Sequence, residues 1–248
     1  TGGTATGGTG GGAGLAGGGG TAPVTYEDVV LSDGPLGFWR FGESSGAVAY
    51  DSSGHGRHAD YTGNVDHDVA GALVGDPDDA VGFAGSQADV RHGYTFDDFD
   101  GTDPYTLETW FRADQYDGAY RHIFNKDFTG TNGRHNIGVF VCTGELLGFE
   151  RIIASTKHQA QAPLPTVGVW THIVGTYDGS DLKLYVDGDL IQTTADDRSQ
   201  DSKPVPSYIG AKRPDLNVLF GALDEFAIYG HALPAHRVRA HYDAGMGR

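Results

Sequence analysis

Short alternating runs of apolar and polar residues recur along most of the chain. In one of the clearest, Leu182, Leu184 and Val186 alternate with Lys183 and Tyr185. A period of two is typical of a β-strand that turns one face to the core and the other away from it. The run therefore predicts a strand with its leucines in the interior.

Similar runs lie on both sides of this strand. The dipeptide Asp187-Gly188 favours a tight hairpin turn, after which "LIQTT" returns, and "THIVGTY" precedes the pair. Further upstream, "YTLETWFRA" alternates in the same way. Glycine, aspartate and proline separate such runs at the spacing typical of all-β sandwiches. The pattern therefore predicts an all-β fold, a two-sheet antiparallel jelly-roll sandwich.

Two short helices are expected outside the strands. Thr25 is a suitable N-cap for "YEDVVLS", which the turn Asp33-Gly34-Pro35 ends. Near the C-terminus, "PAHRVRAHYDAG" has Pro234 in its first turn and Gly245 just past its expected end. No helical period is visible elsewhere.

The first 24 residues have a different composition, almost entirely glycine, threonine and alanine. Such a composition is typical of a flexible linker. However, glycine occupies every third position at Gly8, Gly11, Gly14, Gly17 and Gly20, a period that suits a polyproline II or collagen-like helix and hence an oligomer. Residues 1–24 are therefore expected to be a linker or an oligomeric stalk, and residues 25–248 the sandwich domain with its C-terminal helix.

Charge and cysteine content narrow the classes of partner. The formal net charge of −16 argues against nucleic acid and against an anionic membrane surface. No apolar stretch is long enough for membrane insertion.

Cys142 is the only cysteine, so no disulfide can form within the chain, as expected for assembly in a reducing cytoplasm. The chain begins without methionine, which indicates a fragment or a processed product.

Six motifs, in order, carry a family resemblance. They are "FWRFGESSG", "DSSGHGRHADY", "DDAVGFAG", "TLETWFRA", the pair "WTHIVGTYDG" and "LYVDG", and "GALDEFAIY". This succession resembles the laminin G-like, concanavalin A-like jelly-roll family. The resemblance covers most of the chain after Tyr26 and implies the sandwich fold. Because the fold supports many binding roles and some enzymes, it leaves the ligand open.

The opening "EDVVLSDGPLGFWRFGE", joined to a Gly-rich stretch, resembles the C-terminal region of minor tail proteins from phages of actinobacteria. That resemblance implies a homotrimeric fibre head at the phage tail tip. Its partners would be other tail proteins and a host cell-surface glycan or envelope component.

The sequence lacks the chemistry of a sandwich glycosidase. Such an enzyme needs two carboxylates about 5–9 Å apart, which alternate residues of one strand can supply. The run "LETWF" offers only Glu108, and the neighbours Asp224 and Glu225 are expected to point to opposite faces of their strand. The chain is therefore expected not to be an enzyme.

Calcium is the metal most compatible with the Asp-rich loops, because it binds six to eight oxygens. Asp51 in "DSSG" and Asp224 in "LDEF" match family landmarks where a calcium would tie an early loop to the last strand. The alternative is that each aspartate caps a local turn. The histidines show no zinc motif: His55 and His58 are expected to be polar loop residues, and His172 to pack within the sheet.

A sugar ligand needs aromatic platforms together with planar hydrogen-bonding groups. The segment 114–136 has that composition, and we expect its ligand-binding residues to be Tyr116, Tyr120, Arg121, Arg134 and Asn136. The alternative is an ordinary loop and hairpin.

The function expected from these features is non-catalytic recognition of a host-surface glycan by a phage tail protein. One alternative is a carbohydrate-binding module of a secreted, extracellular glycan-degrading enzyme. A second is a structural cap or trimerisation domain. Oligomeric state would separate the first two, since the fibre requires a trimer held by residues 1–24.

Overall fold

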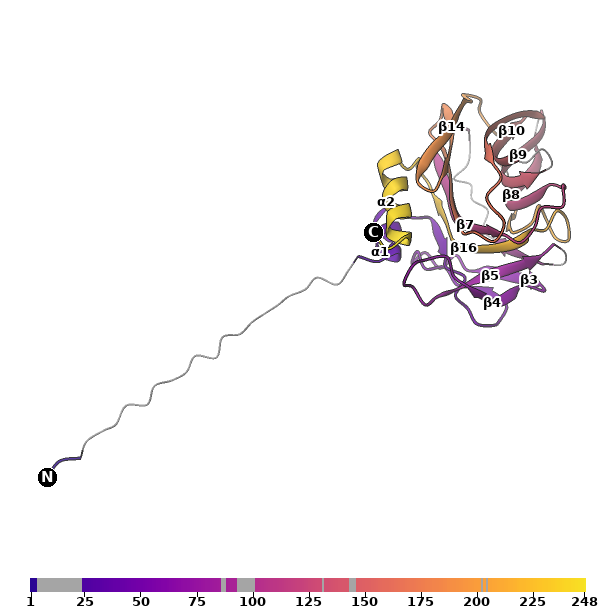
Figure 1. The fold of residues 1–248 in the computed structure, drawn as a ribbon. Coiled ribbons are helices and arrows are strands. Elements are labelled where there is room, and N and C mark those ends of the chain that lie inside the picture. The colour runs from indigo at the N-terminus through magenta and orange to yellow at the C-terminus, as the bar shows by residue number, and fades with distance from the viewer. Residues whose placement is uncertain are drawn as a thin grey trace.

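Two antiparallel β-sheets pack face to face in this protein (Figure 1). The computed structural model describes residues 1–3, 24–85, 88–92, 101–130, 132–142, 146–201, 203 and 205–248. The predicted all-β sandwich is confirmed. The expected stalk falls almost wholly outside the described residues, so its linker and oligomer alternatives both stay predictions.

The first sheet contains β1 (Gly37–Trp39), β4 (Asp66–Ala70), β5 (Asp79–Ala84), β7 (Tyr105–Ala113), β12 (Thr171–Tyr177), β13 (Asp181–Val186), β14 (Asp189–Ala195) and β16 (Phe220–Tyr229). Its strand order is β14-β13-β12-β7-β16-β5-β4, and β1 also pairs with β16. The hairpin between β13 and β14 turns at the predicted Asp187-Gly188, where both residues have positive φ, of 51° and 79°. Glycine adopts that conformation without strain, which explains its place in the turn.

The second sheet contains β2 (Val48–Ala49), β3 (Ala59–Gly63), β6 (Ala88–His92), β8 (Arg121–Gly130), β9 (Gly133–Cys142), β10 (Leu146–Ile153), β11 (Thr156–Pro163) and β15 (Ser207–Ile209). Its order is β11-β10-β9-β8-β15-β6-β3-β2. Strands β8 to β11 follow one another as successive antiparallel neighbours. They form a broad four-stranded surface from one stretch of sequence.

The core lies between the sheets and is built by the alternation expected from the sequence. Leu182 and Leu184 of β13 are fully buried there. Val139 of β9 and Phe149 of β10 contribute from the second sheet. Each strand buries one side chain in two against the opposite sheet, so the side chains between them point away from the core.

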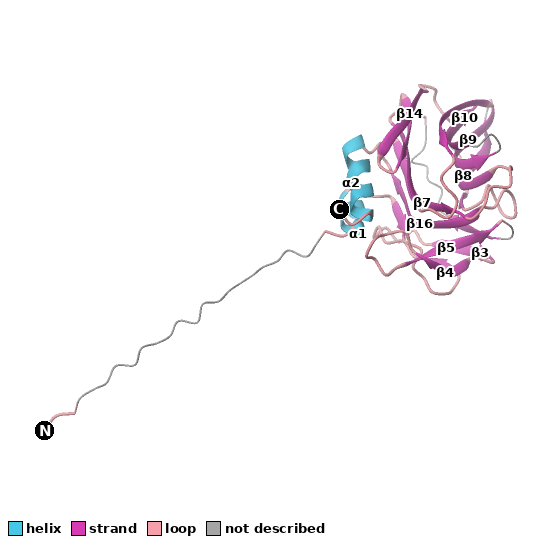
Figure 2. Ribbon diagram, viewed as in Figure 1, coloured by secondary structure: helices cyan, strands magenta, loops and turns pink. Residues whose placement is uncertain are grey.

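Two helices cover the other face of the first sheet (Figure 2). Helix α1 (Tyr26–Ser32) begins at the predicted N-cap Thr25, whose side chain accepts from the amide of Asp28. Helix α2 (Ala235–Gly245) begins after Pro234, and Gly245 is its last residue, one position further than expected. Neither helix, nor any other among the described residues, is long and apolar enough to cross a membrane.

Candidate functional site

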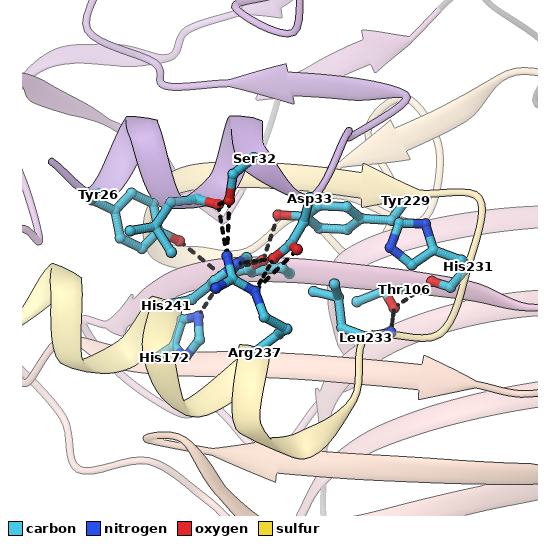
Figure 3. Close-up of polar contacts among 12 residues, drawn as sticks. Tyr26, Ser32, Asp33, Thr106, His172, Tyr229, His231, Leu233, Arg237 and His241 are labelled. Atoms are coloured by element: carbon cyan, nitrogen blue, oxygen red, sulfur yellow. Dashed lines mark hydrogen bonds and ion pairs between the residues drawn. The ribbon is translucent and has the colours of Figure 1, made fainter. Parts of the chain in front are cut away.

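The outward face of the first sheet is closed around a buried glutamate, Glu108 of β7. Its Oε1 accepts a hydrogen bond from the Tyr26 hydroxyl at 3.0 Å, and its Oε2 accepts one from the Tyr229 hydroxyl at 2.9 Å. His172 Nε2 lies 2.8 Å from Oε1, and His241 Nδ1 lies 2.9 Å from both oxygens. Figure 3 shows how these partners converge from both helices and from the sheet. Both oxygens of this carboxylate are thus engaged by protein groups.

His241 carries the network on to helix α1. Its Nε2 lies 2.7 Å from Asp33 Oδ2, and the Arg237 guanidinium binds the same carboxylate at 2.8 Å. Burial by itself would raise the pKa of Glu108, but the imidazoles of His241 and His172 outweigh it and hold that pKa well below its usual range. Glu108 is only 1% exposed. This network therefore fastens the two helices to the sheet and leaves no room for a ligand.

The second sheet turns a different set of side chains away from the core. In β9, Ile137, Val139 and Val141 face inward, so the residues between them face outward. Strand register extends this outward surface across four strands. We call it the β8–β11 face, and it includes His122, Asn125, Asp127, Arg134, Asn136, Gly138, Phe140, Gly148, Glu150, Lys157, Gln159 and Gln161, with Cys142, Leu146 and Ile152 in the same outward alternation.

An aromatic cluster occupies one end of the β8–β11 face. The Phe140 ring lies across Gly148, where a Cβ atom would come within 2.4 Å of the ring. The centroid of that ring is 5.4 Å from Tyr120 and 6.0 Å from His122. Tyr120 remains 43% exposed. Lys157 Nζ lies 5.7 Å from the Tyr120 ring centroid, and the exposed part of the ring is a platform on which a sugar ring could stack.

Buried polar atoms without partners occupy the middle of the face. Asn136 donates from Nδ2 to Glu150 Oε1, and Asn125 donates from Nδ2 to the Lys212 carbonyl, both at 2.7 Å. The Oδ1 atoms of both asparagines and the Nδ1 atom of His122 are buried with no hydrogen-bond partner. An unpaired buried polar group costs about 1–3 kcal/mol. Such groups in a native fold call for a water molecule or a ligand.

Nearby charges set the protonation of this surface. Burial raises the pKa of Glu150, and the contacts with Lys157 and Asn136 only partly offset that effect. Burial, together with the positive charges of Lys212, Arg134 and Lys157, lowers the pKa of His122 to about 3. His122 is therefore neutral near pH 7 and offers one donor and one acceptor nitrogen.

Three of the five expected ligand-binding residues lie together at this face. Asn136 and Arg134 belong to it, and Tyr120 borders it beside Phe140. The other two lie elsewhere. The Tyr116 hydroxyl donates to the Pro165 carbonyl at 2.8 Å. Arg121 forms an ion pair with Asp117, donates to the carbonyls of Gly85 and Val218, and stacks on Phe220. In these contacts Tyr116 and Arg121 brace loops.

Sequence reasoning missed His122, Asn125, Phe140 and Glu150. A signal was present in "RHNIGVFVC", where apolar residues of the core alternate with Asn136, Gly138 and Phe140. That alternation identifies the outward residues of one strand. It does not show which neighbouring strands pair with it, so the residues of β8 and β10 could not be assigned to the same surface.

Asp51 is occupied by its own turn. Its Oδ1 accepts from the amides of Phe38 and Ser53, and its Oδ2 accepts from the amide of Arg57, at distances of 2.8–3.0 Å. These bonds outweigh burial and lower the pKa of Asp51. Turn capping accounts for the bonds from Ser53 and Arg57, and the bond from Phe38 ties the turn to β1.

Asp224 and Glu225 do not follow the simple alternation expected for a strand. A β-bulge interrupts the register of β16 between Asp224 and Ala227, and Glu225 has a φ of 52°. Glu225 Oε1 is 3.0 Å from the Arg40 guanidinium, which also binds Asp76 at 2.7 Å. The expectation that the two side chains point to opposite faces assumed a regular alternation, which the bulge interrupts by adding a residue.

The surroundings of Asp224 do not match a calcium site. Its Oδ2 accepts from the Ala72 amide at 2.7 Å, and burial raises the pKa values of both Asp224 and Glu225. The Arg40 guanidinium already occupies the centre of the acidic cluster. Among the described residues, no group of three or more His, Cys, Asp or Glu side chains could hold a metal ion. Calcium binding by Asp51 and Asp224 stays a prediction that these residues, as folded, do not favour.

The fold is similar to those of several solved binding domains. The receptor-binding domain of a botulinum neurotoxin C/D mosaic is 11% identical with a TM-score of 0.63, over 85% of this chain and 51% of that one. The binding domain of botulinum neurotoxin DC, solved with SialylT, is 12% identical with a TM-score of 0.63, over 86% and 52%. This chain thus spans about half the length of the neurotoxin domains.

A shorter relative matches over nearly its full length. Domain 4 of AbnA, an extracellular arabinanase from Geobacillus stearothermophilus solved with arabinotriose, is 18% identical with a TM-score of 0.62, over 84% of this chain and 98% of that one. At these identities the likeness establishes the fold alone. No curated protein matches the chain. The laminin G model of the concanavalin A-like lectin/glucanases superfamily matches residues 84–239, more than half of the sequence. The chain therefore belongs to the concanavalin A-like lectin/glucanases superfamily.

Proposed function

We propose that this domain binds a glycan on the β8–β11 face and does not cleave it. The observation that carries the proposal is the set of buried, unpartnered polar atoms of His122, Asn125 and Asn136 beside the exposed ring of Tyr120. Sugars present hydroxyl groups and apolar ring faces together, so they complement such a mixed surface.

The carboxylates of the face support binding over hydrolysis. Glu150 is held by Asn136 and by Lys157, whose Nζ lies 3.4 Å from Oε2. Asp127 is held by Arg134 at 3.1 Å and by Lys212 at 3.5 Å. Each carboxylate is thus engaged by neighbours on the face. A glycosidase needs a nucleophile or base that is free to attack or to activate water.

The biological setting we propose is recognition of a host cell surface by a phage tail fibre or minor tail protein. Its support is the motif resemblance and the period-three glycine stretch ahead of Tyr26. In that setting the domain is the head of a homotrimer at the tail tip, in contact with other tail proteins. The mass in solution tests it: the full chain should be trimeric and a chain starting at Val24 monomeric.

A carbohydrate-binding module of a secreted enzyme is the second candidate. The near-complete overlap with an arabinanase domain supports it. A full chain that is monomeric, and that binds plant or microbial polysaccharide, would favour the module over the fibre head.

Glycan binding is tested by screening envelope and plant oligosaccharides and then measuring affinities by calorimetry. Tyr120→Ala should weaken binding about tenfold, because one aromatic contact is worth about 1–1.5 kcal/mol. Tyr50→Ala is the matched control, since Tyr50 is 58% exposed but adjoins β2 at the opposite edge of the sheet. Failure of every glycan to bind, or release of reducing ends by the wild-type protein, would overturn the proposal.

A further inference from the structure

Cations gather around His122 although the chain as a whole is acidic. Lysine and arginine number 17 against 33 aspartates and glutamates. On the β8–β11 face, Lys157 Nζ lies 5.1 Å from the Phe140 ring centroid, next to His122. Arg134 on β9 and Lys212 on an adjoining loop both reach Asp127. This patch thus reverses the overall charge balance.

The carboxylates of the patch do not saturate these cations. Arg134 and Lys212 share a single partner, Asp127, at 3.1 and 3.5 Å. Arginine has five N–H donors and lysine three, so most donors remain free for a ligand. The side chains of Arg134 and Lys157 are 40% and 38% exposed. Three cations therefore face two carboxylates, and the side chains of Arg134 and Lys157 are more than a third exposed, whereas that of Lys212 is 22% exposed.

We propose that the glycan bound on this face carries an acidic group, which Lys157, Lys212 and Arg134 bind beside His122. The inference rests on the proposed glycan binding and specifies the class of sugar. Ion pairs between ligand anions and lysine or arginine are among the stronger hydrogen-bonded contacts in proteins. The patch would thus select an acidic sugar over its neutral counterpart.

The rest of the sheet limits where that group can lie. On β3 and β6, Asp60 pairs in register with Arg91, and Asp89 is almost fully buried. Burial and the neighbouring Asp215 raise the pKa of Asp89 to about 6. Asp89 repels an anion when it is ionised, whereas Asp60 lies opposite the positive Arg91. The acidic group is therefore directed to the β8–β11 end of the sheet, and neutral rings would extend toward β6.

The test uses a matched pair of ligands on the full chain. One is an oligogalacturonate, and the other is the same oligosaccharide with its carboxylates reduced to alcohols. A glycerol phosphate oligomer distinguishes a phosphate from a carboxylate as the preferred anion. The acidic ligand should bind at least tenfold more tightly than the reduced one at low salt. That preference should shrink as salt rises, because the patch is partly exposed.

Charge-removing variants locate the effect. Lys157→Gln and Lys212→Gln should each lower the acidic preference several-fold, while Lys183→Gln, on the first sheet, should leave it unchanged. Binding of the acid should also raise the pKa of His122, read from its ring protons by NMR. Equal affinity for both ligands, or a preference that survives both substitutions, overturns this inference but leaves glycan binding standing. Absence of binding to any glycan overturns both.

Discussion

Glu108 on β7 and Glu150 on β10 are both buried glutamates that point away from the core, one on each sheet. Their surroundings differ. Glu108 receives two tyrosine hydroxyls and two imidazoles, and its pKa is lowered. Glu150 receives one amide and one lysine at 3.4 Å, and its pKa is raised. The fold thus stabilises the ionised form of Glu108 on one face and disfavours the ionised form of Glu150 on the other.

The difference distinguishes the helix-covered face of the first sheet from the proposed binding face of the second. The first sheet has covering helices, which bury its polar groups out of reach of ligands. Several of its buried atoms also lack a partner, namely Trp110 Nε1, His172 Nδ1, Asp224 Oδ1 and Glu225 Oε2. The β8–β11 face has no helix packed over it among the described residues, and its asparagines keep unpartnered oxygens. Incomplete pairing of buried polar groups therefore indicates the candidate site here only where no helix of the described residues covers the sheet.

The largest expected effect comes from Glu108→Gln. Removing one member of a buried ion-pair network costs about 3–5 kcal/mol, because the remaining charged groups lose their partner. We expect a loss of that size in the free energy of unfolding, measured by urea denaturation at pH 6. Glu150→Gln is the matched control and should cost no more than about 1.5 kcal/mol. Equal losses would remove the distinction between the two faces.

The pH dependence of stability sharpens the same comparison. Burial opposes the charged form of His241, but the carboxylates of Glu108 and Asp33 outweigh it and raise the pKa of His241. The stabilisation that His241 contributes is therefore fully present below its unfolded-state pKa of about 6.5, and it is lost as pH rises through the folded-state pKa. The lowered pKa of Glu108 works in the opposite sense, because its contribution is present above about pH 4.3 and is lost as pH falls through the folded pKa.

Stability from this network should accordingly be greatest between about pH 4.5 and 6.5. His241→Gln should flatten the decline on the alkaline side, with about 1.4 kcal/mol removed for each unit by which the pKa was raised. Melting temperatures in steps from pH 4 to 9 measure it. An unchanged alkaline slope in the variant would show that another group causes the decline.

Asp224→Asn probes the covered face at a different point. Burial raises the pKa of Asp224, so the folded state favours its protonated form. The stabilisation that protonated Asp224 contributes to the folded state is fully present below about pH 3.9, and it is lost as pH rises through the folded-state pKa. The asparagine keeps an acceptor for the Ala72 amide and cannot ionise. The variant should therefore be more stable than wild type at pH 8, by about 1 kcal/mol or more in the free energy of unfolding. This gain appears as a higher melting temperature and should vanish near pH 4.

Calcium should have the smallest effect. Asp51 already accepts three backbone amides, and Arg40 lies among Asp76, Asp78 and Glu225. A site occupied at 100 times its dissociation constant would add about 2.7 kcal/mol. We expect no change in melting temperature between calcium and EDTA. A rise with calcium that EDTA reverses would show that Arg40 gives way to the metal.

Part of the candidate site could be predicted from composition. Tyr120, Arg134 and Asn136 were identified because aromatic and planar polar residues are dense in one segment. Tyr116 and Arg121 share that composition, yet they bond to loop carbonyls. Composition indicates what a segment can bind, whereas the direction of each side chain depends on the backbone that carries it.

The sandwich, the N-cap at Thr25 and the hairpin at Asp187-Gly188 could be predicted from the sequence, because they follow from local periodicity and backbone conformation. The β8–β11 face and the bulge beside Glu225, which binds Arg40, became visible only in the folded structure. Both depend on which strands pair and in what register. Pairing is set by long-range packing of the core, and a single residue of shift exchanges the two faces of a strand.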